Sequence, residues 1–274
     1  FKKFCCDERT FSESQKEQAW VNIFISPYPL GIHVRRDIQG IEKLDQLLQS
    51  TKSQVKLNLP CGDTTGNIPF NAIQTSSASV IMRQFNPGEQ AFTGLTVEFF
   101  YDGRTRFHIP LPYMPRWLRH NIESLTSPRA RQAMEKNWGS SDFHLLKFCD
   151  IEKLWLVTLV LVSHYREWLG KLDIFNEFIA GIELTGVWRT VPFIDSDEWA
   201  TYIEKFSLPI VQKDRVTIPE EIGRGLRIQW KDEYSLALSI FALIALELGL
   251  SSDILSGLVA DSIEKRARPK PKPI

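Results

Sequence analysis

Two alternating runs joined by Asp102-Gly103 constrain this chain more than any other feature of its sequence. Residues 95–101 and 104–109 alternate apolar and polar side chains, which is the period of a half-buried strand. An Asp-Gly pair between such runs favours a two-residue type I′ turn, because Asp and Gly tolerate the positive φ values that the turn requires. The sequence therefore predicts an antiparallel hairpin at 95–109.

A two-residue turn also predicts which side chains share a face of this hairpin. It places three pairs on one face: Tyr101 with Arg104, Phe99 with Arg106, and Val97 with His108. Aromatic planes stack on unpaired bases and arginines contact phosphate, so this face is a predicted surface for single-stranded nucleic acid. With two arginines that follow the hairpin, the predicted nucleic-acid-binding residues are Phe99, Tyr101, Arg104, Arg106, Arg116 and Arg119. The alternative is a half-buried sheet whose arginines lie over neighbouring rings and pair with acids elsewhere.

The remaining pattern predicts an α+β protein whose character changes along the chain. Region 1–124 is predicted to combine an amphipathic helix at 38–48 with strands at 54–59 and 79–85, in addition to the hairpin. Region 125–264 is predicted to be mainly helical, with short strands near 187–193 and 215–230. Its predicted helices cover 128–138, 151–169, 173–182, 196–206, 234–248 and 252–266. Residues 265–274 alternate base and proline, which predicts a basic polyproline or disordered tail.

Composition limits the class of partner and the compartment. The chain of 274 residues has 33 Lys and Arg against 33 Asp and Glu, so any charge-driven role must be local. The apolar stretches 154–162 and 234–250 are shorter than the roughly 20 apolar residues of a spanning helix, so no membrane span is predicted. The four cysteines form no regular framework and no glycosylation acceptor occurs, which favours the cytoplasm.

Motifs that would identify an enzyme do not occur in the sequence. It has no phosphate-binding glycine loop, dinucleotide fingerprint, nucleophile elbow, HExxH or CxxC motif, so no cofactor or metal is predicted and a non-enzymatic role is favoured. Residues that an unrecognised, non-contiguous active site would use include His144, Cys149 and His164. An acidic cluster at 195–198 suits a cation, but it also suits the start of a helix.

Two further segments suggest binding. Residues 215–232 run strand, Pro219, short helix, strand and turn, and in this order they resemble the core of AbrB-type swapped-hairpin DNA-binding domains, which implies DNA binding. Glu220 stands where that family often has a base, and a plain connector between strands is the alternative reading. Residues 245–256 have the spacing of a helix-turn-helix, although the second helix has no Arg, Lys, Asn or Gln to reach bases, so a plain helical hairpin is the alternative.

These observations lead to three hypotheses. The first is a non-enzymatic, nucleic-acid-associated accessory or regulatory protein that binds DNA or RNA through the hairpin face. The second is a protein-interaction or scaffold subunit of a larger assembly, with the C-terminal tail as a contact for a protein partner. The third is an enzyme whose active site is not contiguous in the sequence, so its catalytic residues are unknown.

Overall fold

The computed structural model describes residues 19–27, 72–76, 79–85, 92–100, 102–114, 123, 125–138, 145–170, 177–218, 226–229 and 235–257. These residues contain both helices and an antiparallel sheet, so the predicted α+β class is confirmed. The predicted helix at 38–48, the strand at 54–59 and the tail at 265–274 lie outside the described residues. So does the predicted short helix at 220–226 up to residue 225, while its last residue, Leu226, begins a strand.

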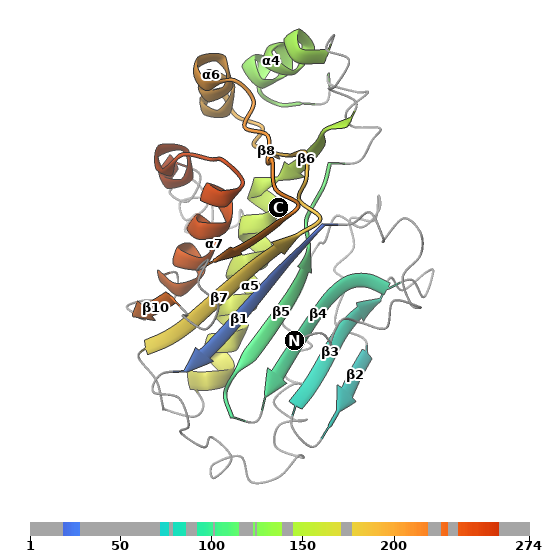
Figure 1. The fold of residues 1–274 in the computed structure, drawn as a ribbon, viewed down its shortest axis with the longest axis vertical. Coiled ribbons are helices and arrows are strands. Elements are labelled where there is room, and N and C mark those ends of the chain that lie inside the picture. Colours follow the sequence, from blue (N-terminus) through green and yellow to red (C-terminus); the bar gives the residue numbers. More distant parts are fainter. Residues whose placement is uncertain are drawn as a thin grey trace, which may run out of the picture.

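A large antiparallel sheet is the centre of the described structure (Figure 1). Eight described strands run in the order β10-β7-β1-β5-β4-β3-β2, with β9 also paired to β7. Their bounds are β1 (Trp20–Pro27), β2 (Ala72–Thr75), β3 (Ser79–Phe85), β4 (Phe92–Phe100), β5 (Thr105–Pro110), β7 (Glu177–Thr185), β9 (Arg215–Ile218) and β10 (Leu226–Gln229). Strands from both predicted regions therefore lie in one sheet, with β1 between β5 and β7.

Helices cover one face of this sheet and extend beyond its end. The described helices are α4 (Pro128–Trp138), α5 (Ile151–Gly170), α6 (Asp197–Phe206) and α7 (Ser235–Glu247). Figure 1 shows α5 behind the sheet and α7 beside β10, whereas α4 and α6 lie past the sheet end near the parallel pair β6 (Lys147–Asp150) and β8 (Thr190–Phe193). The predicted start of α4 is confirmed, because Ser127 Oγ accepts a hydrogen bond from the Ala130 amide at 3.0 Å.

The core lies between the sheet and α5. Strand β7 buries every second residue, Phe178, Ala180, Ile182 and Leu184, and its neighbours β1 and β9 also bury alternate residues. On α5, Trp155 packs against Phe241 of α7 at 5.0 Å between ring centroids. The side chains between the buried positions point to the opposite side of the sheet, which we call the polar face. No described helix covers it in Figure 1.

The predicted helix at 173–182 is wrong, because residues from Glu177 onward form β7. Its apolar side chains satisfy both a helical and a two-residue period when they are read without their neighbours. Hydrogen bonding to β1 on one side and to β9 and β10 on the other selects the strand. Tertiary pairing therefore overrides the local pattern here.

The predicted pairing of the hairpin is also wrong, by one residue. Phe99 lies opposite Thr105, and Arg106 lies opposite Glu98. The connection is a three-residue turn in which Gly103 has a φ of 86°, the Phe100 amide donates to the Arg104 carbonyl at 2.8 Å, and the Gly103 amide donates to the Phe100 carbonyl at 3.0 Å. Because strand side chains alternate, this shift sends Phe99 and Arg106 to opposite faces.

The resemblance of residues 215–232 to a swapped hairpin does not hold in three dimensions. Strands β9 and β10 pair with β7, at 182–185 and 177–180 respectively, so they lie one after the other along the same edge. In the segment at 245–256, α7 is followed by a turn at Gly249, with a φ of 97°, and by helical residues 252–257.

None of the described helices combines the length and apolar character that a membrane crossing requires.

Candidate functional site

A chain of polar side chains crosses four strands on the polar face. Arg215 of β9 donates from Nε to Glu183 Oε1 of β7 at 2.7 Å. Asn22 of β1 donates from Nδ2 to Glu183 Oε2 at 3.3 Å, and Asn22 Oδ1 lies 2.6 Å from His108 Nδ1 of β5. The pairing of the strands causes this arrangement, because Asn22 stands directly opposite both His108 and Glu183.

The direction of these hydrogen bonds determines which ring nitrogen of His108 carries the proton. The Glu183 carboxylate only accepts, so the Asn22 amide group donates to it and the Asn22 oxygen remains as an acceptor. His108 Nδ1 therefore donates to that oxygen. Burial, together with the positive charge of Arg106, lowers the pKa of His108 to about 4, so the ring is neutral at pH 7. Its other nitrogen, Nε2, consequently carries a lone pair that can accept a hydrogen bond.

Trp20 holds the His108 ring from one side. The two rings stack with centroids 4.3 Å apart and planes inclined by 17°. Trp20 can lie there because β4 has a glycine beneath it: a Cβ at Gly94 would be only 2.5 Å from two atoms of the indole ring. The orientation of His108 is therefore set by Asn22 through a hydrogen bond and by Trp20 through stacking.

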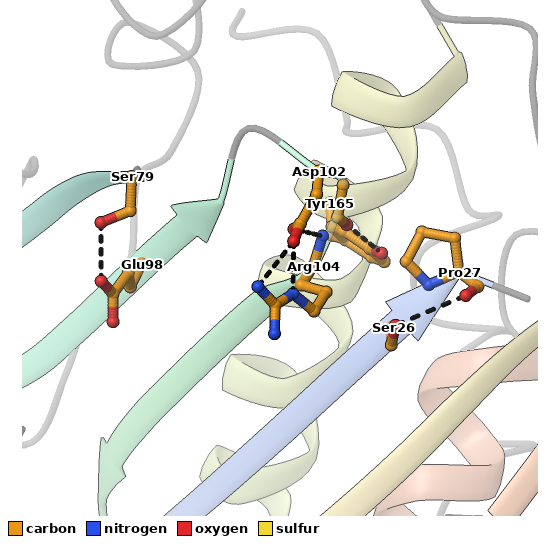
Figure 2. A network of polar contacts seen from close by, with 8 residues as sticks. Ser26, Pro27, Ser79, Glu98, Asp102, Arg104 and Tyr165 are labelled. Carbon is orange, nitrogen blue, oxygen red and sulfur yellow. Dashed lines mark hydrogen bonds and ion pairs between the residues drawn. The ribbon is translucent and has the colours of Figure 1, made fainter. Parts of the chain in front are cut away.

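Arg106 is a basic residue next to this row of hydrogen-bonded side chains. It lies on β5 between Glu98 of β4 and Phe24 of β1, and all three side chains point to the polar face. Glu98 is buried and accepts a hydrogen bond from Ser79 Oγ at 2.7 Å (Figure 2). Within the described part of the chain, the Arg106 side chain makes no hydrogen bond or ion pair. The sole buried side-chain nitrogen or oxygen without a partner among the described residues is Arg131 Nε. Arg106 is half-buried, and its guanidinium is consequently at least partly exposed to solvent.

The hairpin turn places a second arginine at the end of the polar face. Arg104 Nε donates to Asp102 Oδ2 at 2.7 Å, and its guanidinium carbon lies 5.1 Å from the centroid of the Phe100 ring. From the opposite side of the sheet, the buried Tyr165 hydroxyl of α5 donates to the Gly103 carbonyl at 2.8 Å. Figure 2 shows Asp102, Arg104 and Tyr165 meeting around the turn. The turn is thus fixed by α5 while Arg104 stays exposed.

The predicted contact residues separate in the structure. Arg104 and Arg106 lie at the polar face, whereas Phe99 is 2% exposed and belongs to the core. Tyr101, Arg116 and Arg119 lie outside the described residues. The nucleic-acid role of the two described arginines stays a prediction.

Sequence reasoning missed the residues that β1 and β7 bring to this face. These are Trp20, Asn22, Phe24 and Glu183. A signal for β1 was present, because 20–25 alternates polar or aromatic residues with Val21, Ile23 and Ile25.

The residues considered for a hidden active site do not converge among the described residues. Cys149 is fully buried, and burial raises the pKa of its thiol, so it is not a ready nucleophile. His144 lies outside the described residues, and His164 falls within α5. No group of three potential metal ligands occurs in the described part of the chain.

The acidic cluster at 195–198 ties two helices together. Asp195 accepts hydrogen bonds from the Thr126 amide at 2.8 Å and the Ser127 amide at 3.0 Å, and Asp197 accepts from Ser127 Oγ at 2.6 Å. These bonds join the start of α4 to the start of α6. They occupy the Asp195 and Asp197 carboxylates, which would otherwise be the ligands of a cation.

Comparisons with protein-family models, with curated proteins and with solved structures return no match for this chain. The candidate site combines an oriented neutral histidine with a half-buried arginine, side by side on a sheet face with half-buried aromatic rings.

Proposed function

We propose that this protein is a nucleic-acid-associated accessory or regulatory factor that binds single-stranded segments on its polar face. The observation that carries the proposal is the partly exposed guanidinium of Arg106, which has no partner among the described residues, opposite the half-buried Phe24. An arginine contacts phosphate and a neighbouring ring stacks on a base, which is the combination that single-stranded nucleic acid requires.

The observed pairing of the hairpin strands changes which aromatic rings lie beside the two arginines. Phe99 is lost to the core, and the half-buried rings of Phe24 and Phe100 take its place on the side that carries Arg104 and Arg106. The proposed contact set is therefore Phe24, Phe100, Arg104 and Arg106, extending the predicted arginines with rings from β1 and β4.

Charge on the polar face also supports an anionic ligand. The Glu183 carboxylate is neutralised by Arg215, and Glu98 is buried beneath the surface with Ser79 as its hydrogen-bond donor. Arg106 forms no ion pair within the described residues, whereas Arg104 is paired with the partly exposed Asp102 at 2.6 Å. Local attraction of this kind is compatible with a zero net charge over the whole chain.

The double variant Arg104→Ala, Arg106→Ala tests the proposal. Fluorescence anisotropy of labelled single-stranded oligonucleotides at 50 and 200 mM salt should show weaker binding. The negative slope of log K against log salt should become shallower by about 1.4, since each phosphate contact contributes about 0.7. Arg129→Ala is the matched control, because it removes an exposed arginine of α4 that pairs with Glu204 at 3.0 Å, away from the sheet. Unchanged affinity and slope in a folded double variant would refute the proposed surface.

A further inference from the structure

Nε2 of His108 is an acceptor that the polar face leaves available. Within the described residues it has no hydrogen-bond partner, and it is not among their fully buried unpaired atoms, so this nitrogen of the half-buried ring is partly accessible to a ligand. Asn22 and Trp20 hold the ring in place before any ligand arrives. Such an acceptor offers a ligand a hydrogen bond at little further entropic cost.

A positively charged hydrogen-bond donor, Arg106, lies beside this acceptor. His108 and Arg106 are two residues apart on β5 and point to the same face, which separates their Cα atoms by about 7 Å. Arg106 is close enough for its positive charge to act on the histidine. A ligand that spans the pair must combine a negative group with a hydrogen-bond donor a short distance away.

RNA carries both groups on neighbouring atoms of each nucleotide. The ribose 2′-hydroxyl donates a hydrogen bond, and the phosphate is attached through oxygen to the adjacent 3′ carbon. DNA has the phosphate but lacks the hydroxyl. We propose that the polar face prefers RNA to DNA, because His108 Nε2 accepts a hydrogen bond from the 2′-hydroxyl of a nucleotide whose phosphate contacts Arg106. This inference rests on the proposed function, and it identifies the class of nucleic acid that the site takes.

The roles of the two side chains differ and can be separated. Arg106 contacts a group that RNA and DNA share, so its loss weakens both by the same factor. His108 contacts a group that RNA alone has, so its loss weakens RNA and leaves DNA unchanged. The neutral ring has one free acceptor and no free donor, so a 2′-O-methyl group, which cannot donate, is not accepted.

The test compares three oligonucleotides of one sequence: RNA, DNA and 2′-O-methyl RNA, with the full chain and anisotropy as readout. The unchanged protein should bind RNA about three- to tenfold more tightly than the other two, as expected for one hydrogen bond. His108→Phe keeps a ring for Trp20 to stack on and removes the acceptor, so it should bind all three at the level of DNA. Arg106→Ala should weaken RNA and DNA equally.

The outcomes separate this inference from the proposed function. Equal binding of all three oligonucleotides by the unchanged protein would overturn the RNA preference and leave the proposed function standing, whereas no binding of any would overturn both. An RNA preference that survives in His108→Phe would show that His108 is not its source. Should that variant fail to fold, Asn22→Leu, which releases the Nδ1 hydrogen bond, should reduce the preference for RNA in its place, and an unchanged preference would count against the inference.

Discussion

Gly94 of β4 leaves the space on the polar face that the Trp20 indole of β1 occupies. It has a φ of 96°, a conformation that other residues adopt only with strain, and it faces the Trp20 indole at a distance that leaves no space for a side chain. The stacking of Trp20 on His108 depends on this contact. One residue without a side chain thus supports the orientation of the candidate site.

Gly94→Ala is expected to lower the free energy of unfolding by about 1–3 kcal/mol, because it combines backbone strain with a steric clash. Urea denaturation followed by circular dichroism measures the change. Gly181→Ala is the control: Gly181 lies in β7 without a positive φ, and a Cβ there would meet no atom within 4 Å. The control should change stability by less than about 1 kcal/mol. Equal losses in the two variants would contradict the role given to Gly94.

His108 makes stability depend on pH in a defined window. The unfolded chain binds a proton on this residue below pH 6.5, whereas the folded protein does so only below about pH 4, so stability is full above pH 6.5 and is lost as the pH falls from 6.5 to 4. Between pH 7.5 and 5 the loss should be about 2 kcal/mol. Urea denaturation at both pH values should show a smaller loss in His108→Gln, which does not titrate. The same loss in both proteins would assign the effect to other groups.

The site could be predicted only in part, because its residues are far apart in the sequence. The arginines at 104 and 106 were identified from the composition of the hairpin. The partners of His108 come from β1 and β7, and no local pattern relates residues 22, 108 and 183 before the strand order is known. Sequence patterns specify periods, whereas pairing specifies neighbours.

At the scale of elements, Tyr165 connects the central helix to the hairpin. Its ring is fully buried and packs edge-on against Phe107 and Phe178, and its hydroxyl reaches the Gly103 carbonyl. Burial raises the pKa of this hydroxyl well above its usual value, so it stays protonated and remains a donor. The three-residue turn is thereby fixed from the side opposite to the candidate site.

Tyr165→Phe is expected to lower the free energy of unfolding by about 1–2 kcal/mol and to reduce protection of the hairpin amides, because the buried Gly103 carbonyl loses its partner. Hydrogen exchange followed by nuclear magnetic resonance measures the second effect. Tyr202→Phe removes a comparable bond to the Gly249 carbonyl, at 2.9 Å, and should leave the hairpin protected. Unchanged protection in Tyr165→Phe would contradict the proposed connection.

Element prediction from the sequence succeeded where end signals are strong. Ser127 and Pro128 begin α4. Ser196 caps α6 by accepting from the Trp199 amide, so the helix begins one residue after the predicted start at 196. It failed where two solutions have similar local energies. A two-residue and a three-residue turn both suit Asp102-Gly103, and the strand and helix periods both suit residues near Ile182.

At the scale of the whole molecule, the sheet joins strands from both sides of the predicted boundary at 124–125. Strand β1 pairs with β5 along one edge and with β7 along the other, and the buried apolar residues from Ala19 to Leu255 form one cluster. Neither side of the boundary keeps its buried surface without the other. We therefore expect the described elements to unfold together.

Urea denaturation should show a single transition, with coincident curves from tryptophan fluorescence and from far-ultraviolet circular dichroism. Tryptophans report on both sides of the boundary, because Trp20 lies in β1 while Trp155 and Trp199 lie in α5 and α6. Two separated midpoints would show that regions 1–124 and 125–264 unfold independently.

The interrupted edge formed by β9 and β10 has a practical consequence for engineering. Ile218 stands opposite Ile182 and Leu226 opposite Ala180, so residues 219–225 join two strands that are already aligned on β7. Each strand is held by its own pairing, and doubling the length of a connection costs only about 0.6 kcal/mol in closure entropy. A spectroscopic tag or a peptide epitope can therefore be spliced between Ile218 and Leu226 while the sheet retains its register.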